Sequence, residues 1–278
     1  MRALDPEVVD AVWAAVEPLL PAPDRSHPLG CHRPRLPDRV CFEAMLVRLV
    51  TGCSWVDAER LAGNQVSDTT LRARRDEWIA AGVFDAVAAE ALAGYDRVIG
   101  LDLSDVAIDG CLNKAPCGGE GTGKNPTDRG KLGWKWSIAT DANGIVIGWV
   151  LDAANRNDIV LLEPTLDTLS ERGLLADIET MHLDKGYDSH GTRRLLADLG
   201  IADAVVGRRQ LKNQPELAKP FNLARRWMVE RTNSWLSNLG QLRRNTDRRP
   251  RHRHAQFALA LTLLLTAKLI DWAHRWTN

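Results

Sequence analysis

The chain has 278 residues, which is enough for one large domain or two modest ones. Its 45% of hydrophobic and 26% of charged residues are ordinary for a soluble globular protein. The five cysteines are odd in number and irregularly spaced, which argues against a disulfide framework or a CxxC metal site and favours a reducing cytoplasm.

Charge is distributed unevenly along the chain, although the formal net charge is zero. Residues 207–254 contain thirteen lysines and arginines against three acidic residues, an excess of ten, and the remainder is acidic by the same amount. A solvated helix surface would normally interleave the two signs. The asymmetry therefore predicts a face that binds a polyanion.

Neither end of the chain predicts a membrane segment. The first ten residues, MRALDPEVVD, lack the basic start and apolar core of a signal peptide. The most apolar run, 255–270, is about sixteen residues long and contains Lys268, whereas a membrane span needs roughly twenty apolar residues. We expect this run to be a buried helix and expect no membrane partner.

Residues 1–95 are predicted to form short helices. Pro6 suits the first turn of a helix, and a proline-rich loop follows over residues 21–37. Apolar residues share one face of a helix over residues 38–51, and a further helix begins near Trp55.

The last of these helices carries a cluster of arginines. Residues 67–68 can cap it, and it stops at Gly82. Arg72, Arg75 and, further round, Arg74 are expected on its exposed side. Short helices that end in an arginine-bearing helix resemble a helix-turn-helix module, but a plain helical bundle with surface arginines fits equally well.

From about residue 98 the pattern changes to strands. Residues 106–110, 134–140 and 145–152 are rich in β-branched and aromatic residues, and the last two segments are separated by DANG, a hairpin turn signal. Further elements then follow: helix 159–171, strand 179–184, helix 192–199, apolar run 202–207, helix 223–236 and helix 255–276. This order predicts a mixed α/β layer.

A glycine-rich stretch, GGEGTGKN at residues 118–125, matches the phosphate-cradling loop G-x-x-x-x-G-K-[ST] except at its last residue. Asn125 lacks the magnesium-binding hydroxyl, and the next element is a strand and not the helix whose amides would bind phosphate. We expect no ATP site. We expect instead a mobile basic loop that carries Lys114, Lys124, Arg129 and Lys131.

Three carboxylates stand where phosphoryl-transfer chemistry would need them. Asp109 ends the strand VAIDG, Asp184 ends the strand in HLDKGYDSHG, and Glu230 lies in the helix RRWMVERTNSWL. Carboxylates at the ends of adjacent strands, joined by one from a helix, can hold two Mg²⁺ ions roughly 4 Å apart. One ion would activate the attacking oxygen and the other would stabilise the leaving oxygen.

Each carboxylate also has a structural interpretation. An aspartate at a strand end often caps a turn, and a glutamate beside an arginine is often a surface pair. Spacing alone does not choose between the three and five other aspartates: Asp102, Asp105, Asp128, Asp158 and Asp188.

The blocks around these carboxylates occur in a set order along the chain. TGCSWVDAERL and DTTLRARRDEWIAAGVF are followed by VAIDG, TDRGKLGWKWSIATDANG, HLDKGYDS, and VERTNSWL with LRRNTDRR. They resemble the DDE transposases of bacterial insertion sequences, closest to the compact insertion-sequence-five group of the IS4-like superfamily. The last two blocks are the most specific part of the resemblance.

This resemblance implies a fold, a site and an activity. It implies a helical DNA-end-binding region over residues 1–95, then an RNase H-like catalytic domain over residues 96–278 with a mixed sheet flanked by helices, a basic C-terminal segment and a closing helix. Asp109, Asp184 and Glu230 would be the catalytic ligands of Mg²⁺, for which Mn²⁺ substitutes, without ATP. A homodimer or larger assembly at the cytoplasmic nucleoid would cleave double-stranded DNA at the element's ends and join it to target DNA.

The resemblance also implies DNA contacts around the site. Related transposases carry Y-x-x-R-x-x-x-E-x-x-x-x-x-x-K, in which Arg226 fills the arginine position here but Leu223 and Ser237 replace the tyrosine and the lysine. Lys185 and Tyr187 position the scissile phosphate or support the turn after Asp184. The candidate DNA-binding residues are Arg72, Arg74, Arg75, Lys124, Arg129, Lys131, Lys185, Arg226, Arg231, Arg243 and Arg244.

The chain has ten tryptophans, and bases can stack on their rings. Core packing is the commoner role, and we expect it for Trp134, Trp136, Trp149, Trp227 and Trp235. Whether any of them holds an unpaired base stays open.

Two rival function classes stay open. A transposase-derived protein that binds DNA without catalysis would be expected to have lost one of the three carboxylates by drift. A metal-dependent nuclease that cuts without joining would need the same residues, so only a strand-transfer product separates it from a transposase.

Overall fold

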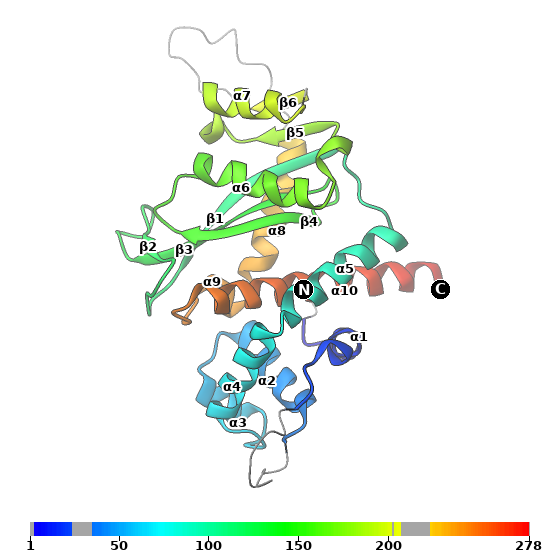
Figure 1. The fold of residues 1–278 in the computed structure, drawn as a ribbon, viewed down its shortest axis with the longest axis vertical. Coiled ribbons are helices and arrows are strands. Elements are labelled where there is room, and N and C mark those ends of the chain that lie inside the picture. Colours follow the sequence, from blue (N-terminus) through cyan, green and yellow to red (C-terminus); the bar gives the residue numbers. More distant parts are fainter. Residues whose placement is uncertain (1–2, 24–34, 202, 207–222, 278) are drawn as a thin grey trace. The chain divides into compact units, whose positions relative to one another are not determined.

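The computed structural model describes residues 3–23, 35–201, 203–206 and 223–277 (Figure 1). The chain divides into two compact units, one of residues 1–99 and 237–278 and the other of residues 100–236. The division after residue 99 lies close to the predicted one near residue 95. The C-terminal residues, which the prediction assigned to the second domain, pack with the first helices.

The first unit is helical. Its elements are α1 (Pro6–Val16), the 3₁₀ turn η1 (Glu17–Leu19), α2 (Asp38–Thr51), α3 (Trp55–Leu61), α4 (Asp68–Ala80), α5 (Val83–Val98), α9 (Gly240–Arg243) and α10 (Pro250–Thr277). The side chains of Asp5, Ser54 and Ser67 accept backbone N–H groups and so cap α1, α3 and α4. The predicted range of α2 and the Ser67 cap are confirmed.

Two glycines bring the two parts of this unit together. Gly52 ends α2 in the left-handed region, with a φ of 76°, and its α-carbon lies against the backbone of Gly240 at the start of α9. A side chain on either glycine would collide with the other backbone. The close approach shows why residues 237–278 fold with the N-terminal helices.

Helix α10 accounts for the most apolar run of the chain. Judged by length and composition alone, it could cross a membrane, since the mean hydropathy of its most apolar window is 1.4. It packs along α5 and α1, and Phe257, Leu263 and their neighbours are buried there. This burial confirms the predicted core helix. The helix begins at Pro250 and not at residue 255, because the first turn buries His252 and Arg253.

The second unit is built on a mixed sheet. Its strands are β1 (Asp105–Lys114), β2 (Gly123–Lys124), β3 (Leu132–Thr140), β4 (Val146–Ala153), β5 (Thr180–Leu183) and β6 (Asp203–Val206). Strands β1, β3 and β4 form an antiparallel meander, and β5 and β6 continue from β1 in parallel. The resulting order, β4-β3-β1-β5-β6 with the short β2 beside β3, is that of an RNase H-like core and confirms the expected fold.

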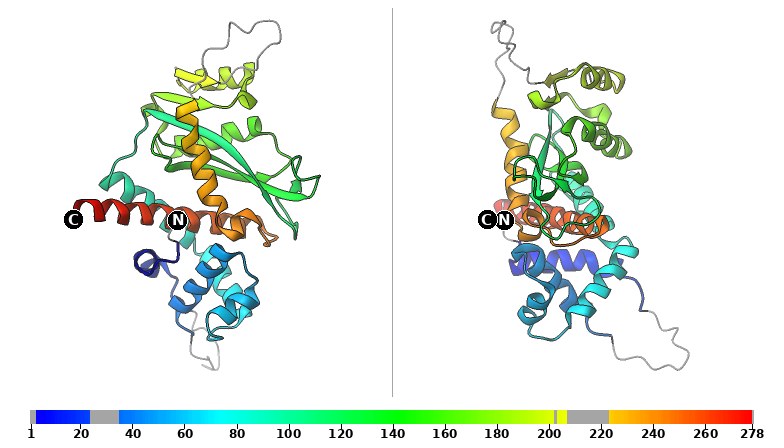
Figure 2. Two further views of the ribbon diagram at one scale, coloured as in Figure 1. Left: turned by 180° about the vertical axis from the view of Figure 1, so that it is seen from behind. Right: turned by 90° about the vertical axis from the view of Figure 1, so that its left-hand side faces the viewer.

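Helices cover both faces of this sheet. They are α6 (Asp158–Glu171), α7 (His190–Asp198) and α8 (Leu223–Ser237), with the 3₁₀ turns η2 (Leu175–Asp177) and η3 (Lys185–Tyr187). Thr165 of α6 donates to the Ser137 hydroxyl at 2.8 Å, whereas Asn233 of α8 accepts from Trp136 at 2.7 Å. Because successive strand residues point to opposite faces, α6 and α8 lie on opposite sides of β3 (Figure 2).

Candidate active site

The first two predicted catalytic residues lie at neighbouring positions in the centre of the sheet. Strands β1 and β5 pair in parallel up to Ile108 and Leu183, and Asp109 and Asp184 are the residues that follow. Neighbouring strands lie about 4.8 Å apart, and paired residues of parallel strands point to the same face. The β1–β5 register therefore brings the two aspartates together.

Asp184 follows strand β5 directly and caps the turn after it. Its carboxylate accepts from the backbone N–H of Lys185 at 2.5 Å and so caps the turn η3. The Lys185 side chain is exposed beside it, whereas Tyr187, two residues on, is only 1% exposed. Of the two expectations for Tyr187, its burial favours support of the turn over contact with a phosphate.

The buried hydroxyl of Tyr187 has a perturbed pKa. Burial and then the charges of Asp158, Asp109 and Asp184 raise the pKa of Tyr187 well above 10.0. Ser137 lies beside the hydroxyl and has the opposite effect on the pKa, but within the described chain no well-formed hydrogen bond reaches that hydroxyl. Tyr187 is therefore a buried, neutral group that is sensitive to the charges of these carboxylates.

Helix α8 is joined to Asp109 by an asparagine. The side-chain Nδ2 of Asn233 donates to Asp109 Oδ2 at 3.2 Å, and its Oδ1 accepts from the indole Nε1 of Trp136 at 2.7 Å. Glu230 lies one helical turn before Asn233, and residues three apart are neighbours on a helix surface. The third predicted carboxylate thus lies on the helix that contacts Asp109, one turn from the contact.

The predicted hairpin turn also holds this helix. The guanidinium of Arg231 donates to the carbonyl of Asn143 and the hydroxyl of Thr232 donates to the carbonyl of Gly144, each at 2.7 Å. Gly144 has a φ of 79°, and a side chain there would collide with Thr232. The DANG turn therefore connects β3 to β4 and docks α8 at the same time.

The three carboxylates have the donor atoms that a divalent metal needs, but their side chains are not close enough together to hold one. Among the residues that the structure describes, no three Asp, Glu, His or Cys side chains are close enough together to hold a metal ion. The Glu230 side chain is exposed, and three carboxylates without a cation repel one another. The all-oxygen donor set of Asp109, Asp184 and Glu230 is of the kind that suits Mg²⁺ or Mn²⁺.

The five competing aspartates each have a polar partner within 4 Å. Their partners are Ser104 for Asp102, His182 for Asp105, Lys114 for Asp128, Lys135 for Asp158 and Arg193 for Asp188. The distances range from 2.5 Å for the hydrogen bond of Asp102 to 3.8 Å for the ion pair of Asp128. Each of the five thus has a local partner, as Asp109 has Asn233 and Asp184 has the backbone N–H of Lys185.

Asp158 nevertheless lies beside the site, on the α6 face. Its carboxylate packs against the α-carbon of Gly110, where a side chain would collide with it. The buried ammonium of Lys135 donates to Asp158 at 2.7 Å and to the carbonyl of Arg156 at 3.0 Å. Lys135 and Asn233 were missed by sequence reasoning. The available signals were a lysine inside an apolar strand and an asparagine one turn after Glu230.

Arg74 and Arg75 were wrongly predicted to be exposed. Both are buried, because α4 packs against α2, α5 and α10 and presents these two positions inward. Arg74 pairs with Asp38 and Glu77. Arg75 pairs with Asp76 and Asp247, at 2.9 and 3.2 Å. Arg72 is exposed, as predicted, and pairs with Asp68 at 2.7 Å.

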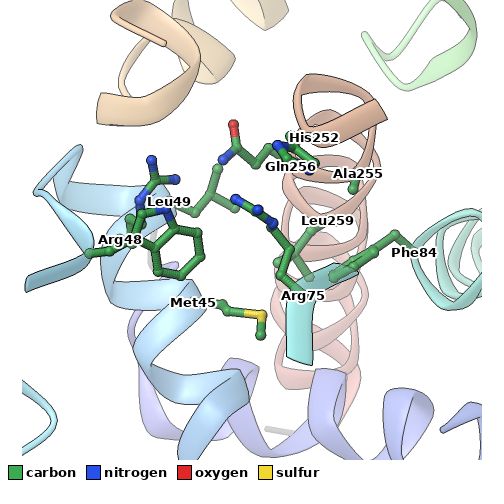
Figure 3. A pocket seen from close by; sticks show the side chains of 10 residues that line it. Met45, Arg48, Leu49, Arg75, Phe84, His252, Ala255, Gln256 and Leu259 are labelled. Carbon is green, nitrogen blue, oxygen red and sulfur yellow. The ribbon is translucent and has the colours of Figure 1, made fainter. Parts of the chain in front are cut away.

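The buried arginines belong to a polar cluster inside the helical unit (Figure 3). Arg48 and Arg75 both lie over the ring of Trp55 and both pair with Asp247. The cavity beside them is about 20 Å³, with room for about one water molecule. The cluster therefore builds the core of the unit and offers no ligand site of useful size.

The other predicted basic residues differ in their surroundings. Arg231 is half-buried between the rings of Trp227 and Trp235, whose centroids lie 4.4 and 4.5 Å from its guanidinium carbon. Trp227 is 46% exposed, so the expectation of core packing is wrong for it. The exposed residues are Lys124, Arg129, Lys131, Lys185, Arg243 and Arg244, and the side chain of Arg226 lies outside the described residues.

The glycine loop is not followed by the helix that a phosphate-binding loop requires. Lys124 ends the short strand β2, and turns then lead directly into β3, so no helix follows the glycines. The buried Asn125 side chain accepts from the backbone and hydroxyl of Thr127, at 2.9 and 2.8 Å. The predicted absence of the phosphate-binding helix is confirmed.

Two family profiles match the chain. Residues 101–265, more than half of its length, match the family described as "Transposase DDE domain". Residues 8–88 match the family described as "Putative transposase of IS4/5 family". The boundary between the two matches falls between the helical N-terminal region and the sheet. The match to the DDE domain also includes the first sixteen residues of α10.

Curated relatives are found in Burkholderia cepacia. The "Putative transposase for insertion sequence element IS402" is 41% identical over 133 residues, which cover 46% of this chain and 60% of the relative. The "Insertion element IS402 uncharacterized 16.2 kDa protein" is 31% identical over 121 residues, covering 44% of this chain and 82% of the relative. The chain thus spans 60% of the length of the first relative.

Among solved structures, the chain is similar to the Mos1 transposase paired-end complex with left transposon end. The similarity covers 89% of this chain and 82% of that chain, with 14% sequence identity and a TM-score of 0.27. The fold assignment above rests on strand order and register and not on this distant similarity.

Proposed function

The chain belongs to the transposase DDE domain family, and on this basis we propose that it is a DNA transposase. It cleaves DNA at the ends of an insertion sequence and transfers the cut strand into target DNA. The observation that carries the proposal is the β1–β5 register, which makes Asp109 and Asp184 neighbours, together with the contact between Asp109 and the helix that bears Glu230.

The chain's own residues have separate tasks in this reaction. Asp109, Asp184 and Glu230 are the ligands that would hold Mg²⁺ or Mn²⁺. When bound there, two such ions would activate the attacking oxygen and stabilise the leaving oxygen of the phosphoryl transfer. Asn233 holds Asp109 in place, and the exposed ammonium of Lys185 lies next to Asp184, where it can pair with a phosphate.

Double-stranded DNA is the proposed partner of both units. Exposed cations that can pair with its phosphates are Arg72, Lys124, Arg129, Lys131, Lys185, Arg243 and Arg244. Release of counterions from the DNA would make binding fall steeply with salt. We expect the protein to act in the cytoplasm, as a homodimer or larger assembly that holds two DNA ends.

The proposal is tested by incubating the protein with DNA that carries both ends of its insertion sequence, with Mg²⁺ or Mn²⁺. The variants Asp109→Asn, Asp184→Asn and Glu230→Gln keep side-chain size and remove one charge each. Asp167→Asn, at an exposed position of α6 in the same unit, is the matched control for a surface carboxylate change. Each variant is first checked for folding and for DNA binding.

We expect all three carboxylate variants to bind DNA but neither to cut nor to join it, while the control cuts and joins like the unchanged protein. A carboxylate variant that keeps its activity would remove that residue from the site. Intact protein that binds the ends without cutting them would favour a DNA-binding role, and cutting without a joined product would favour a nuclease.

A further inference from the structure

We propose that Asn233 is the positioning residue that sets the orientation of the Asp109 carboxylate for metal binding, an inference that rests on the proposed function. Asn233 is 8% exposed and contacts β1 and β3 at once from α8. It is held between the Asp109 carboxylate at 3.2 Å and the Trp136 indole at 2.7 Å.

The chemistry of the indole decides which way the amide points. An indole N–H is a donor only, so the Asn233 atom that faces Trp136 must be the oxygen. The amide nitrogen therefore faces Asp109 and donates to its Oδ2. Trp136 is fully buried, so its ring cannot turn away and the orientation is set by packing.

The strand register supports the same arrangement. Asp109 pairs with Ile138, and Cys111 pairs with Trp136. Residues two apart along a strand share a face, so Asp109 and Trp136 both point towards α8. One side chain from α8 can therefore reach both of them, and Asn233 has one acceptor and one donor group of the required kinds.

The consequence for the site is that the Asp109 carboxylate on β1 and the helix α8 beside it are both held in place. A carboxylate whose one oxygen accepts a buried amide N–H is restricted in rotation, and its orientation towards a metal is set before the metal binds. Losing a group that hydrogen-bonds to a metal ligand typically lowers metal affinity by about 10–100-fold. Asn233 also fixes α8 one turn after Glu230, so the same side chain ties two of the proposed ligands together.

The test measures Mn²⁺ binding to the full chain by electron paramagnetic resonance, with and without DNA that carries the element's ends. Asn233→Leu keeps the approximate size and removes both hydrogen bonds, and Trp136→Phe removes the indole N–H that orients the amide. Thr232→Val is the matched control, because Thr232 is fully buried on the same helix and tethers it to Gly144 without touching Asp109. Thermal unfolding confirms that each variant is folded.

We expect Asn233→Leu to weaken Mn²⁺ binding at least about tenfold. Trp136→Phe should weaken it less, and Thr232→Val should change it less than about twofold. An Asn233→Leu protein that binds Mn²⁺ like the unchanged protein overturns the inference, and so does an equal loss in Thr232→Val, which would indicate helix docking alone. If Asn233→Leu does not fold, Trp136→Phe takes its place in the test. A Trp136→Phe protein that binds Mn²⁺ like the unchanged protein then overturns the inference. Unchanged protein that neither binds Mn²⁺ nor cuts DNA overturns the proposed function itself.

Discussion

Thr232 donates its hydroxyl to the carbonyl of Gly144 at 2.7 Å, so the helix that carries Glu230 is held by the turn between β3 and β4. The two residues are 88 positions apart in the chain. Gly144 combines a positive φ with a space that the Thr232 hydroxyl fills. A hairpin glycine has here a second role, which is to allow the close approach of a helix.

Gly144→Ala should therefore destabilise the protein by about 2–4 kcal/mol, from left-handed backbone strain and from the collision with Thr232. Gly173→Ala is the matched control, because Gly173 has a φ of 71° but open space where a side chain would lie. It should cost only about 1–2 kcal/mol. Urea unfolding measures both, and equal losses in the two variants would contradict a docking role for Gly144.

Asp141 begins the same turn and gives the protein a pH dependence. It is 1% exposed, and burial raises its pKa above the ordinary value of 3.8, although three backbone N–H groups donate to it. The folded state therefore holds this proton more tightly than the unfolded state. The stability that Asp141 contributes is fully present below pH 3.8 and is lost as the pH rises through its folded pKa.

Asp141→Asn removes this titration and keeps the oxygen that accepts from Asn143 and Ile145. The difference in unfolding free energy, variant minus unchanged protein, should increase as the pH rises above 3.8 and then level off. Asp167→Asn, at an exposed position of α6, should show no such rise. A difference that is independent of pH would refute the assignment to Asp141.

Removing the hydroxyl of Tyr187 should leave the protein folded and active. The ring fills the space beneath the site, but its hydroxyl has no well-formed hydrogen bond within the described chain. Tyr187→Phe should change the unfolding free energy by less than about 1 kcal/mol, whereas Tyr187→Ala should cost about 3–5 kcal/mol. Loss of DNA cleavage in a fully stable Tyr187→Phe protein would show that the hydroxyl acts in the reaction.

The Lys135–Asp158 pair should respond asymmetrically to substitution. Lys135 is 4% exposed and Asp158 is 41% exposed, so Asp158→Asn leaves a buried ammonium with less compensation. We expect a cost of about 1–3 kcal/mol for Asp158→Asn, below the range for fully buried pairs because water screens Asp158. Lys135→Met should cost less than about 1 kcal/mol, and the double variant should resemble Lys135→Met. A larger loss in Lys135→Met than in Asp158→Asn would contradict this account.

Asp247 should be the most sensitive carboxylate of the helical unit. It is 8% exposed and pairs with the buried Arg48 and Arg75 at 3.1 and 3.2 Å. Asp247→Asn leaves the buried Arg48 without its counter-charge and Arg75 with Asp76 alone, and should cost about 3–5 kcal/mol. Asp57→Asn, which breaks an exposed pair with Arg60, should cost less than about 1 kcal/mol. Similar unfolding midpoints in urea for the two variants would contradict a buried role for Asp247.

Local patterns predicted much of the fold correctly. The apolar strands, the DANG hairpin and the Ser67 cap are properties of neighbouring residues, so they appear in the sequence before any tertiary contact is made. Helix α5, which follows Gly82 directly, and the short α9 were not predicted. The resemblance of the blocks then implied the RNase H-like core, which periodicity could not.

Exposure was less predictable than secondary structure. Arg74 and Arg75 were expected at the surface because arginines usually are, but α4 is covered on several sides and ion pairs compensate their burial. Trp227 was expected in the core and is 46% exposed, with its ring against Arg231. Which side of a helix is covered depends on its neighbours in space, which a single helix pattern does not contain.

The sequence by itself determined the three candidate carboxylates, their order along the chain and the elements that carry them. Only the tertiary structure decided that Asp109 and Asp184 follow paired positions of neighbouring strands and that Asn233 joins Asp109 to the Glu230 helix. The physical reason is that register and helix docking are set by packing across the sheet. A hydrogen bond between residues 124 positions apart leaves no periodic signal in either segment.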